Sequence, residues 1–414
     1  MPDYERSRIE LAIDRAMRQD RINRRTFLGR AGRGGLALGA MATLPGLLAA
    51  CAPGETTLAW ANWPLYIDVD EESDPNPTPY PTINAFIAET GINVDYREAI
   101  GDNAEFFQLL LPDLSAGNYT QWDLITPGGW VVQRMANLDY LEPLDHSKLP
   151  NWTANAAAHA VNNWYDPDNT HSVWWQGGIT GIAFDPNLTG RELSTFDDLL
   201  DPEYAGRVGA FSDMRDMFGL TLLSLGIVPE NATIDDVSAA RDVLVEANDR
   251  NQFRGYYGNE YYDGLANGDL IASVAWSGDV SQIRVDNPDV QFVIPEDGGM
   301  RWNDNLCIPK GSTEKIDQAH QLINYWYDLT AATTLSEYIA YFTGVEGVQE
   351  RMLQDADAAR DAGDTEDADR LEALAPGVVP TEDQIANTYT DKQMDEEEEA
   401  QWNDLWLDVY VESA

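Results

Sequence analysis

Aromatic and acidic side chains occur together in several short turns of this chain. The run LANGDLIASVAWSGDVSQI, residues 265–283, is apolar until it ends in Trp276 and Asp279, with Gly278 between them. Rings and acids also occur in other predicted turns, at Trp63 with Tyr66, Trp130, Asp213 with Asp216, Trp302 with Asp304, and Tyr341. Ring faces and carboxylates are the two groups that bind an organic ammonium ion. The plainer interpretation is that each turn only ends a strand and that each Trp fills a core.

A flexible diamine or polyamine needs both residue types. Its methylene groups would lie against flat apolar rings. Its ammonium groups would meet carboxylates, and each charge-assisted hydrogen bond would contribute about 1.5–3 kcal/mol. Acids at both ends of such a site would also set the length of the ligand. Since burying an unpaired carboxylate is costly, we expect the empty site to be open to water.

The sequence offers little support for catalysis. Its four His residues, at 146, 159, 171 and 320, are scattered, and it has no H-E-x-x-H, C-x-x-C, G-x-S-x-G or glycine-rich phosphate-loop motif. Asp213 and Asp216 fit the N-cap and N3 positions of a helix, but they also fit a ligand contact or an acid/base pair. These three interpretations stay open, and we expect a binding protein, not an enzyme, with no cofactor and no metal.

The pattern of the elements indicates an α/β fold. Strands are predicted at 57–61 and 92–96, and a strand followed by a glycine turn at 122–130. Helices are predicted over 82–90, 131–138, 212–226, 234–248, 261–267, 318–329 and 334–339. In such folds ligands bind at the carboxyl ends of strands, which is where the ring-and-acid turns fall. Residues 70–81 predict a loop, and the Asp- and Ala-rich run 349–374 predicts a solvated helical insertion.

The first fifty residues have the layout of an export signal. Arg24 and Arg25 precede an apolar stretch over 36–50, which ends in small residues before Cys51. This order is typical of a twin-arginine signal peptide followed by a lipid-modified cysteine. The alternatives are an uncleaved anchor helix or a cleaved signal without a lipid. We therefore expect a lipid-anchored protein outside the cytoplasm, with Cys51 as the lipidation site and no membrane span in the mature chain.

The composition is strongly acidic. The chain carries 71 Asp and Glu against 26 Lys and Arg, a formal net charge of −45, and its only Lys residues are at 148, 310, 315 and 392. Such a surface repels nucleic acid and attracts cations. Adaptation to high salt explains the same composition equally well. Cys307 lies in an apolar run and is expected to be a buried small hydrophobe, so no disulfide is expected.

Six runs of the sequence resemble the polyamine-binding (spermidine/putrescine) proteins of ABC importers. They are NWPLY, ETGINVDY, WDLITPGGWVVQRM, TFDDLLDPEYAGRVG, LANGDLIASVAWSGD and VIPEDGGMRWNDNLCIPKG. The resemblance covers about residues 57–348. It implies a two-lobe periplasmic-binding-protein fold of type II-like topology, with the ligand between the lobes. It divides the chain into a signal peptide at 1–50, a first lobe at 51–176 with 303–349, and a second lobe at 177–302 with 350–414, in which 350–375 would be an acidic helical insertion.

The resemblance also assigns roles to residues. The aromatic box of the family falls on Trp63, Tyr66, Trp276, Trp302 and Tyr341. Its ammonium-binding carboxylates fall on Asp213, Asp216, Asp279 and Asp304. The family often has Ser and Tyr where this chain has Gly128 and Trp130, so a hydroxyl contact is lost and an indole is gained. A late polar contact of the family, near the C-terminus, has no match in this sequence.

These observations together predict a lipid-anchored, monomeric receptor outside the cytoplasm that binds a polyamine and delivers it to an ABC permease with its ATPase. A receptor for another small solute, such as a sugar, is the first alternative, because rings and carboxylates also bind sugars. An extracellular hydrolase that uses Asp213 and Asp216 is the second. A sensor or adhesion lipoprotein without transport is the third.

Overall fold

The computed structural model describes residues 56–69 and 78–412. The chain divides into two compact units, Met1–Gly54 and Glu55–Ala414, and the described residues all belong to the second. The predicted export signal and Cys51 therefore lie outside the described residues, as does most of the predicted 70–81 loop. None of the helices in the described part is long and apolar enough to cross a lipid bilayer.

Within these described ranges, eleven strands form one sheet. Its main path has the order β2-β1-β3-β9-β4-β7-β5-β6, with β8 and β10 paired to β4 and β11 paired to β9. The strands are β1 (Thr57–Asn62), β2 (Asn93–Glu98), β3 (Leu124–Ile125), β4 (Ser172–Phe184), β5 (Val208–Phe211), β6 (Phe253–Tyr257), β7 (Ala272–Trp276), β8 (Gln291–Val293), β9 (Gly299–Cys307), β10 (Phe342–Thr343) and β11 (Thr388–Tyr389). β1 is parallel to β2 and β3, and β5 is parallel to β6 and β7. Each end of the sheet is thus a parallel α/β arrangement.

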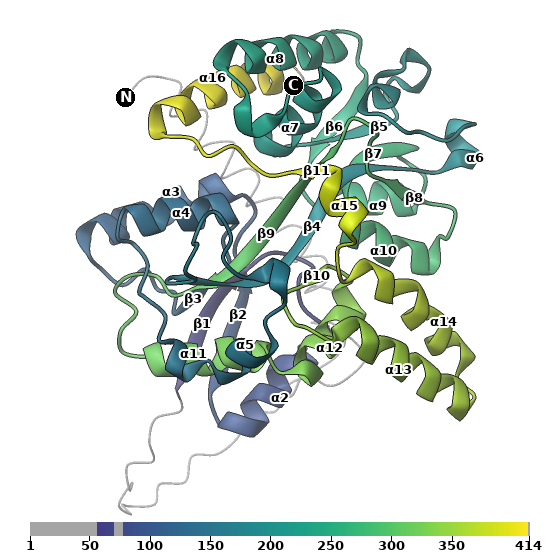
Figure 1. The fold of residues 1–414 in the computed structure, drawn as a ribbon. Coiled ribbons are helices and arrows are strands. Elements are labelled where there is room, and N and C mark those ends of the chain that lie inside the picture. The colour runs from purple at the N-terminus through teal and green to yellow at the C-terminus, as the bar shows by residue number, and fades with distance from the viewer. Residues whose placement is uncertain (1–55, 70–77, 413–414) are drawn as a thin grey trace, which may run out of the picture. The chain divides into compact units, whose positions relative to one another are not determined.

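The two long strands β4 and β9 join these ends. They pair antiparallel from Ser172 with Cys307 to Thr180 with Met300, and the register shifts between Trp174 and Gln176. Figure 1 shows them crossing the middle of the described unit, with β1, β2 and β3 on one side and β5, β6 and β7 on the other. We call the part around β1–β3 lobe 1 and the part around β5–β7 lobe 2.

Helices cover both lobes (Figure 1). They are α2 (Pro81–Thr90), α3 (Asn103–Ala116), α4 (Gly129–Asn137), α5 (Pro150–Asn155), α6 (Pro186–Thr189), α7 (Met214–Ser224), α8 (Ile234–Asp249), α9 (Tyr261–Ala266), α10 (Ser277–Asp286), α11 (Ile316–Trp326), α12 (Leu329–Ile339), α13 (Val348–Ala362), α14 (Thr365–Leu374), α15 (Glu382–Ala386) and α16 (Glu396–Glu412). Short 3₁₀ turns lie at His146–Lys148, Ala158–Ala160, Phe196–Leu200, Pro202–Tyr204, Pro229–Asn231 and Ala375–Gly377.

Each lobe has its own hydrophobic core. In lobe 2, Phe211, Val274 and Phe218 are fully buried in one cluster, which also takes in Trp402 from α16. In lobe 1, the Trp60 ring lies edge-on to Trp175 at 5.2 Å between ring centroids. Cys307 is buried in the core against α4, as expected of a small hydrophobe, and burial raises the pKa of its thiol.

Most of the predicted elements are confirmed, and α3 and α10 are among the helices that were missed. The predictions over 57–61, 82–90, 92–96, 131–138, 234–248 and 261–267 match β1, α2, β2, α4, α8 and α9 within a few residues. α3 was missed although Asp102 caps it by accepting a hydrogen bond from the Glu105 amide at 2.8 Å. α10 was missed because it begins directly after β7, where the sequence suggested only a polar turn.

The acidic run 349–374 is only partly solvated. It folds as two helices, α13 and α14, separated at Gly363, which takes a φ of +88°. Met352 and Leu374 are buried in the core of lobe 1, because each helix of this acidic run still carries one apolar stripe. The predicted lobe boundaries stay a prediction, and this packing favours placing 350–375 with lobe 1 rather than with lobe 2.

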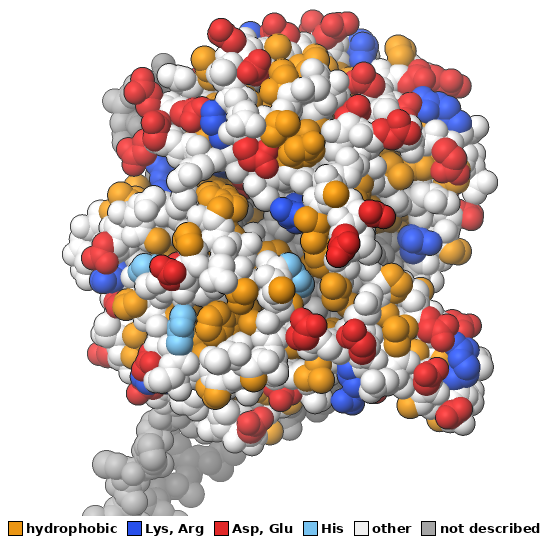
Figure 2. Space-filling view, viewed as in Figure 1, with side chains coloured by type: hydrophobic (Ala, Val, Ile, Leu, Met, Phe, Trp, Pro, Cys, Tyr) orange, Lys and Arg blue, Asp and Glu red, His pale blue; other side chains and the backbone are white. Residues whose placement is uncertain are grey.

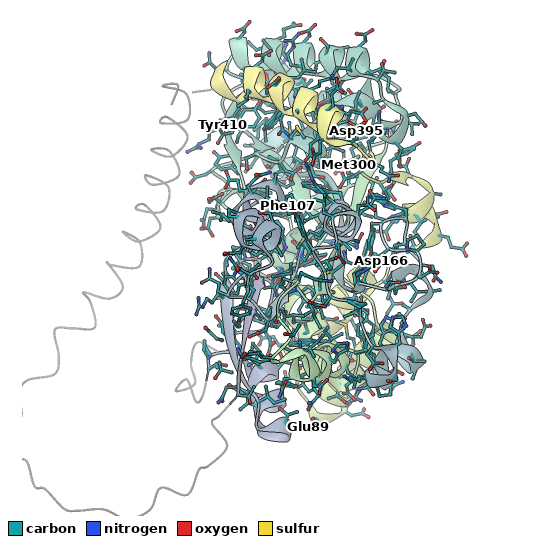
Figure 3. The ribbon with its side chains drawn as sticks, turned by 90° about the vertical axis from the view of Figure 1, so that its left-hand side faces the viewer. Glu89, Phe107, Asp166, Met300, Asp395 and Tyr410 are labelled. Carbon is teal, nitrogen blue, oxygen red and sulfur yellow. The ribbon has the colours of Figure 1, made fainter. Side chains whose placement is uncertain are left out.

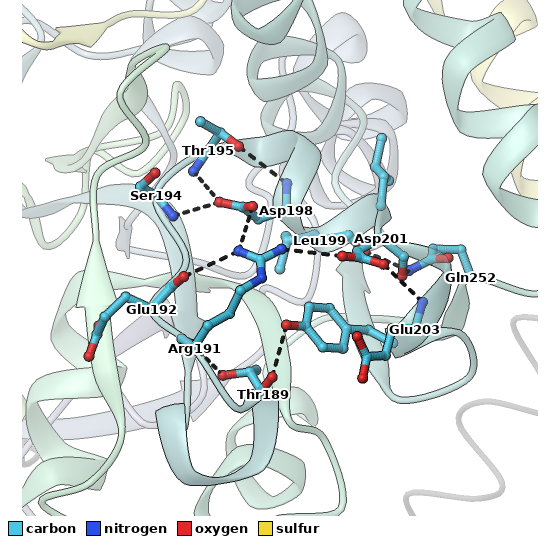
Figure 4. Close-up of polar contacts among 12 residues, drawn as sticks. Thr189, Arg191, Glu192, Ser194, Thr195, Asp198, Leu199, Asp201, Glu203 and Gln252 are labelled. Atoms are coloured by element: carbon cyan, nitrogen blue, oxygen red, sulfur yellow. Dashed lines mark hydrogen bonds and ion pairs between the residues drawn. The ribbon is translucent and has the colours of Figure 1, made fainter.

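The run TFDDLLDPEYAGRVG has a structural role away from the ring-and-acid turns (Figure 4). Asp198 closes a capping box with Thr195 and accepts a hydrogen bond from Arg191 Nη1 at 2.7 Å. Gln252 Nε2 donates to the Leu199 carbonyl at 2.7 Å, and this bond ties the run to the segment before β6. The acidic residues of this run therefore stabilise the local structure of lobe 2 and are not candidates for ligand contacts.

Acidic side chains are spread over the face shown in Figure 2, with fewer Lys and Arg among them. Several of the basic residues are held in ion pairs, such as Lys148 with Asp317 and Arg360 with Glu372. Exposed pairs of this kind contribute little to stability. The excess of acidic over basic residues gives the protein a negative field that attracts cations.

Candidate functional site

A cleft at the crossing strands contains all of the predicted ligand-binding residues. Its free volume is about 120 Å³, whereas a single water needs roughly 10–15 Å³. The predicted residues that line it are Trp63, Tyr66, Trp130, Asp213, Asp216, Trp276, Asp279, Trp302, Asp304 and Tyr341. They come from both lobes and from the strands between them, so the structure places them together as the sequence predicted. Their role as ligand contacts stays a prediction.

The rings form a continuous row along the cleft. Tyr66 and Tyr341 are 5.3 Å apart between ring centroids and meet edge to face. Trp302 lies 5.5 Å from Tyr341 and 6.1 Å from Trp276. Phe211, which the sequence analysis did not single out, continues the row at 4.5 Å from Trp276. Rings in such a row present flat apolar faces and negative ring quadrupoles to a ligand that lies along the row.

Asp304 is the acid on the lobe 1 side. It lies on β9 opposite Gln176 of β4, two residues after Trp302, so both side chains leave the crossing strand on the same face. The Tyr66 hydroxyl donates a hydrogen bond to Asp304 Oδ2 at 3.0 Å. The turn that holds Tyr66 includes Leu65 in the left-handed region, with a φ of +57°. A strained backbone conformation beside a cleft is typical of functional sites, and here it holds the Tyr66 hydroxyl against Asp304.

Asp279 lies in the first turn of α10. It accepts hydrogen bonds from the Tyr261 hydroxyl at 2.7 Å and from the Tyr341 hydroxyl. The N-terminus of α10 adds a partial positive charge, which also favours a carboxylate at this place. Trp276 is the N-cap residue of the same helix, so Trp276 and Asp279 are held by one strand-to-helix junction.

Asp213 and Asp216 have different roles in the structure. Asp213 caps α7, because its Oδ1 accepts hydrogen bonds from the amides of Arg215 and Asp216. Asp216 faces the cleft instead, and its Oδ2 accepts a hydrogen bond from Trp276 Nε1 at 3.2 Å. Asp213 thus has a capping role, and both acids line the cleft, so their ligand contacts stay a prediction.

Glycines make room for two of the rings. A Cβ atom on Gly278 would lie 2.5 Å from the ring of Tyr341, and one on Gly178 would lie 2.7 Å from the ring of Trp302. These distances are shorter than any side chain tolerates, so both positions require glycine for the rings to lie where they do. Gly278 thus has a reason to stand between Trp276 and Asp279.

Replacing Gly278 by Ala is therefore expected to displace the Tyr341 ring and to break its hydrogen bond to Asp279. We expect a loss of ligand affinity of about tenfold, since the variant costs one charge-assisted hydrogen bond. Gly101→Ala is the matched control, because nothing lies within 4 Å of a Cβ there although Gly101 also lines the cleft. Equal affinity of the two variants would contradict this role of Gly278.

The cleft acids are buried, which corrects the expectation of a site open to water. Asp279 is 1% exposed, Asp304 6% and Asp216 8%. Burial raises the pKa of Asp304 to about 8 and that of Asp279 to about 6, while phenol hydrogen bonds act in the opposite direction. Burial and the nearby Asp213 raise the pKa of Asp216 well above its usual value. Hydrogen bonds from phenol and indole groups take the place of water at these acids.

These raised pKa values predict that ligand binding depends on pH. An ammonium group prefers the ionised carboxylates, so binding must expel a proton wherever an acid is protonated in the empty cleft. We expect affinity to rise with pH through about 6 and 8 and then to level off until the amine itself titrates near 10. Titration calorimetry in buffers of different ionisation enthalpy would measure the released protons.

The folding stability of the protein without ligand depends on pH in the opposite direction, falling as the pH rises. Because the folded-state pKa values are raised, protonation of these acids stabilises the empty protein, fully below about pH 4. That contribution is lost as the pH rises through about 6 and 8.

For the binding prediction, a flat affinity between pH 5 and 9, with no proton release, would contradict the assignment of Asp304 and Asp279.

The structure adds cleft residues that the sequence analysis missed. Asp102, Arg215, Arg301 and Asp391 all line the cleft. Burial raises the pKa of Asp102 and of Asp391 to about 6 each. Asp391 comes two residues after the short strand β11, which the sequence did not predict, so the strand-then-acid pattern became visible only in the structure.

Comparison with known proteins assigns the family. The model of the family described as bacterial extracellular solute-binding protein matches residues 82–364. This chain belongs to that family. Its relatives include the putrescine-binding periplasmic protein PotF of Escherichia coli, 29% identical over 336 residues, which cover 76% of this chain and 85% of that protein. Spermidine/putrescine-binding periplasmic protein 1 of Haemophilus influenzae is 29% identical over 262 residues, 63% of this chain and 71% of that protein.

Solved structures of such solute-binding proteins share the fold. A structure from Listeria monocytogenes is 26% identical, covers 86% of this chain and 99% of its own, and has a TM-score of 0.71. The spermidine/putrescine ABC transporter substrate-binding protein PotD of Streptococcus pneumoniae is 23% identical, covers 87% and 100%, and has a TM-score of 0.66. The predicted two-lobe fold is confirmed, and family membership also confirms that this solute-binding protein is not an enzyme. The hydrolase alternative is thereby excluded.

Proposed function

We propose that this protein binds a polyamine, spermidine or putrescine, between its lobes and delivers it to the permease of an ABC importer. The observation that carries the proposal is the cleft itself, in which a row of rings runs between buried acids. The named relatives that bind putrescine and spermidine support the same ligand class.

The physical match is one of shape and charge. The rings of Trp276, Trp302 and Tyr341 form the walls for the methylene chain. Asp304 lies by Tyr66, and Asp216 lies by Trp276. An ammonium group donates hydrogen bonds to such oxygens and also faces the rings, and a cation–π contact contributes about 0.5–2 kcal/mol. A neutral sugar would leave these acids without a countercharge, which disfavours the sugar alternative.

Binding would close the lobes. A ligand that contacts Asp304 on one side and Asp216 on the other binds the closed state more tightly than the open state, so it shifts the equilibrium toward closure. The crossing strands β4 and β9 would carry the hinge motion, because they are the part of the sheet common to both lobes. The closed form is then the one that the permease and its ATPase receive.

We also propose that the protein acts outside the cytoplasm as a monomer held by a lipid on Cys51, after export by the twin-arginine route. The support is the order of the sequence signals around Arg24, Arg25 and Cys51. Two acyl chains hold a protein at a membrane where one does not. Metabolic labelling with a fatty-acid analogue should label the unaltered chain and not Cys51→Ala.

Titration calorimetry tests the ligand class. Putrescine, spermidine and a panel of sugars are titrated separately into the mature chain at neutral pH. We expect heat from at least one polyamine and none from the sugars. Heat from a sugar alone would overturn the proposed function. Repeating the titration from low to multi-molar salt separates short-range contacts in the cleft from the long-range field of the acidic surface, since only the latter is screened.

A further inference from the structure

The last helix, α16, is fixed to lobe 2. Trp402 and Trp406 pack against Phe218 with centroid distances of 5.9 and 5.4 Å. Arg241 of α8 forms an ion pair with Asp408 at 2.7 Å. Figure 3 shows α16 with Asp395 near one end and Tyr410 near the other, and Phe107 on a helix of lobe 1 beneath it.

The first turn of α16 contacts lobe 1. Arg134 of α4 forms an ion pair with Glu399 and a second one with Glu396 at 3.4 Å. The Arg134 guanidinium lies 5.4 Å from the ring centroid of Phe107, which keeps it on lobe 1. Glu399 is 7% exposed, so this carboxylate is almost completely removed from water by the contact between lobes.

Arg215 completes the contact from the lobe 2 side. Its guanidinium carbon lies 4.1 Å from the ring centroid of Trp130 on α4. Its Nη2 lies 3.7 Å from Glu399 Oε1, and its Nη1 donates to the Lys392 carbonyl at 3.1 Å. One face of Trp130 is therefore covered by a cation of the protein itself and is not available to a ligand.

We propose that Arg134, Glu399, Arg215 and Trp130 form a clasp between the lobes that exists only while the cleft is closed. The proposal rests on the proposed function. A fissure of about 490 Å³ beside the clasp is lined by Arg134, Arg215 and Glu399. When the lobes part, water enters there and solvates the charged groups, so the open state pays no penalty for a buried, unpaired charge. The Arg134–Glu399 pair of the clasp, which does not line the cleft, therefore favours closure without touching the ligand.

The clasp and the cleft share residues. Arg215 lies between Asp213 and Asp216 in the sequence, and both Arg215 and Trp130 line the cleft as well. The segment from Thr390 to Lys392 runs from the cleft to the clasp, and the charge of Arg215 lowers the pKa of Asp391, which burial raises. A ligand held by Asp216 and the clasp formed by Arg215 thus act on the same closing motion. Arg134 and Glu399 are positioning residues, which set how long the ligand stays bound.

A double-mutant cycle tests the clasp. Arg134→Gln, Glu399→Gln and the double variant are titrated with putrescine and spermidine, and their dissociation rates and thermal unfolding are measured. We expect each single variant to raise the dissociation rate and the Kd for both ligands by about tenfold. We expect the double variant to be no worse than the single ones, because either change already removes the pair.

The control cycle uses Arg241→Gln and Asp408→Asn, an ion pair of α16 that lies entirely within lobe 2. This cycle is expected to leave Kd unchanged. If Arg134 and Glu399 show coupling in unfolding but none in Kd, the pair persists in the open state and the clasp is refuted. If the unaltered chain binds no polyamine, both the proposed function and the clasp are refuted. If it binds polyamine but the cycle shows no coupling in Kd, only the clasp is refuted.

Discussion

The variant Asp304→Asn is expected to bind putrescine and spermidine at least about 30-fold more weakly than the unaltered protein. Removing one partner of a buried, hydrogen-bonded charge pair costs about 2–5 kcal/mol of binding free energy, and 1.4 kcal/mol corresponds to a factor of ten. Asn keeps the size of the side chain and can still accept the hydrogen bond from Tyr66, so the change removes the charge and little else. Titration calorimetry at neutral pH measures the loss.

A control variant and the pH dependence of the affinity make this experiment specific to Asp304. Asp289→Asn removes an exposed carboxylate from the loop after α10, away from the cleft lining, and should leave the Kd within about twofold at moderate salt. In Asp304→Asn the rise in affinity near pH 8 should also disappear, because Asp304 is the cleft acid whose pKa lies there. Unchanged affinity in Asp304→Asn would remove Asp304 from the site.

Trp302→Ala is expected to weaken polyamine binding by about 30-fold or more. Trp302 is the centre of the ring row, since it contacts both Trp276 and Tyr341. Its loss removes a wall of the cleft and the cation–π contact in one step, and buried Trp residues at the centre of a binding site commonly cost 2 kcal/mol or more when truncated. The measurement is again the Kd by calorimetry, with circular dichroism to show that the variant folds.

Two further variants separate the ring from the bulk of the side chain. Trp302→Phe keeps a ring face and should recover most of the affinity lost in Trp302→Ala. Trp152→Ala removes an indole that is packed against lobe 1 outside the cleft and should leave Kd unchanged. If Trp302→Ala bound polyamines as well as the unaltered chain, the row of rings would have no part in recognition.

The sequence predicts much of the fold because many elements carry local signals. α8 shows apolar spacing and a Thr233–Asp236 capping box, and α2 begins with Pro81 and ends before Gly91. α10 was missed because Ser277 and Gly278 look like a turn, whereas the packing of Gly278 against Tyr341 is visible only in three dimensions. The buried stripe of α13 and α14 was missed because Met352 and Leu374 are diluted among Asp and Ala.

The residues of the site could be predicted from the sequence because the ends of the strands in an α/β fold lie close together. Each ring-and-acid turn was visible in sequence, and the α/β rhythm placed these turns at one edge. Three features required the structure. Burial raises the pKa of Asp304 and Asp279. Arg215 covers one face of Trp130. Glu399 comes into contact with Arg134, which lies 265 positions away in the chain. Burial and long-range pairing are tertiary properties, and no local pattern encodes them.

In the proposed function, rings from distant segments enclose a protonated amine whose ends meet buried acids. A crystal structure of the protein with spermidine tests it most directly. We expect density along the row from Tyr66 to Trp276, with amine nitrogens within hydrogen-bonding distance of Asp304 and Asp216. Spermidine bound only to acids of the outer surface, with the cleft still filled by solvent at a saturating ligand concentration, would contradict it.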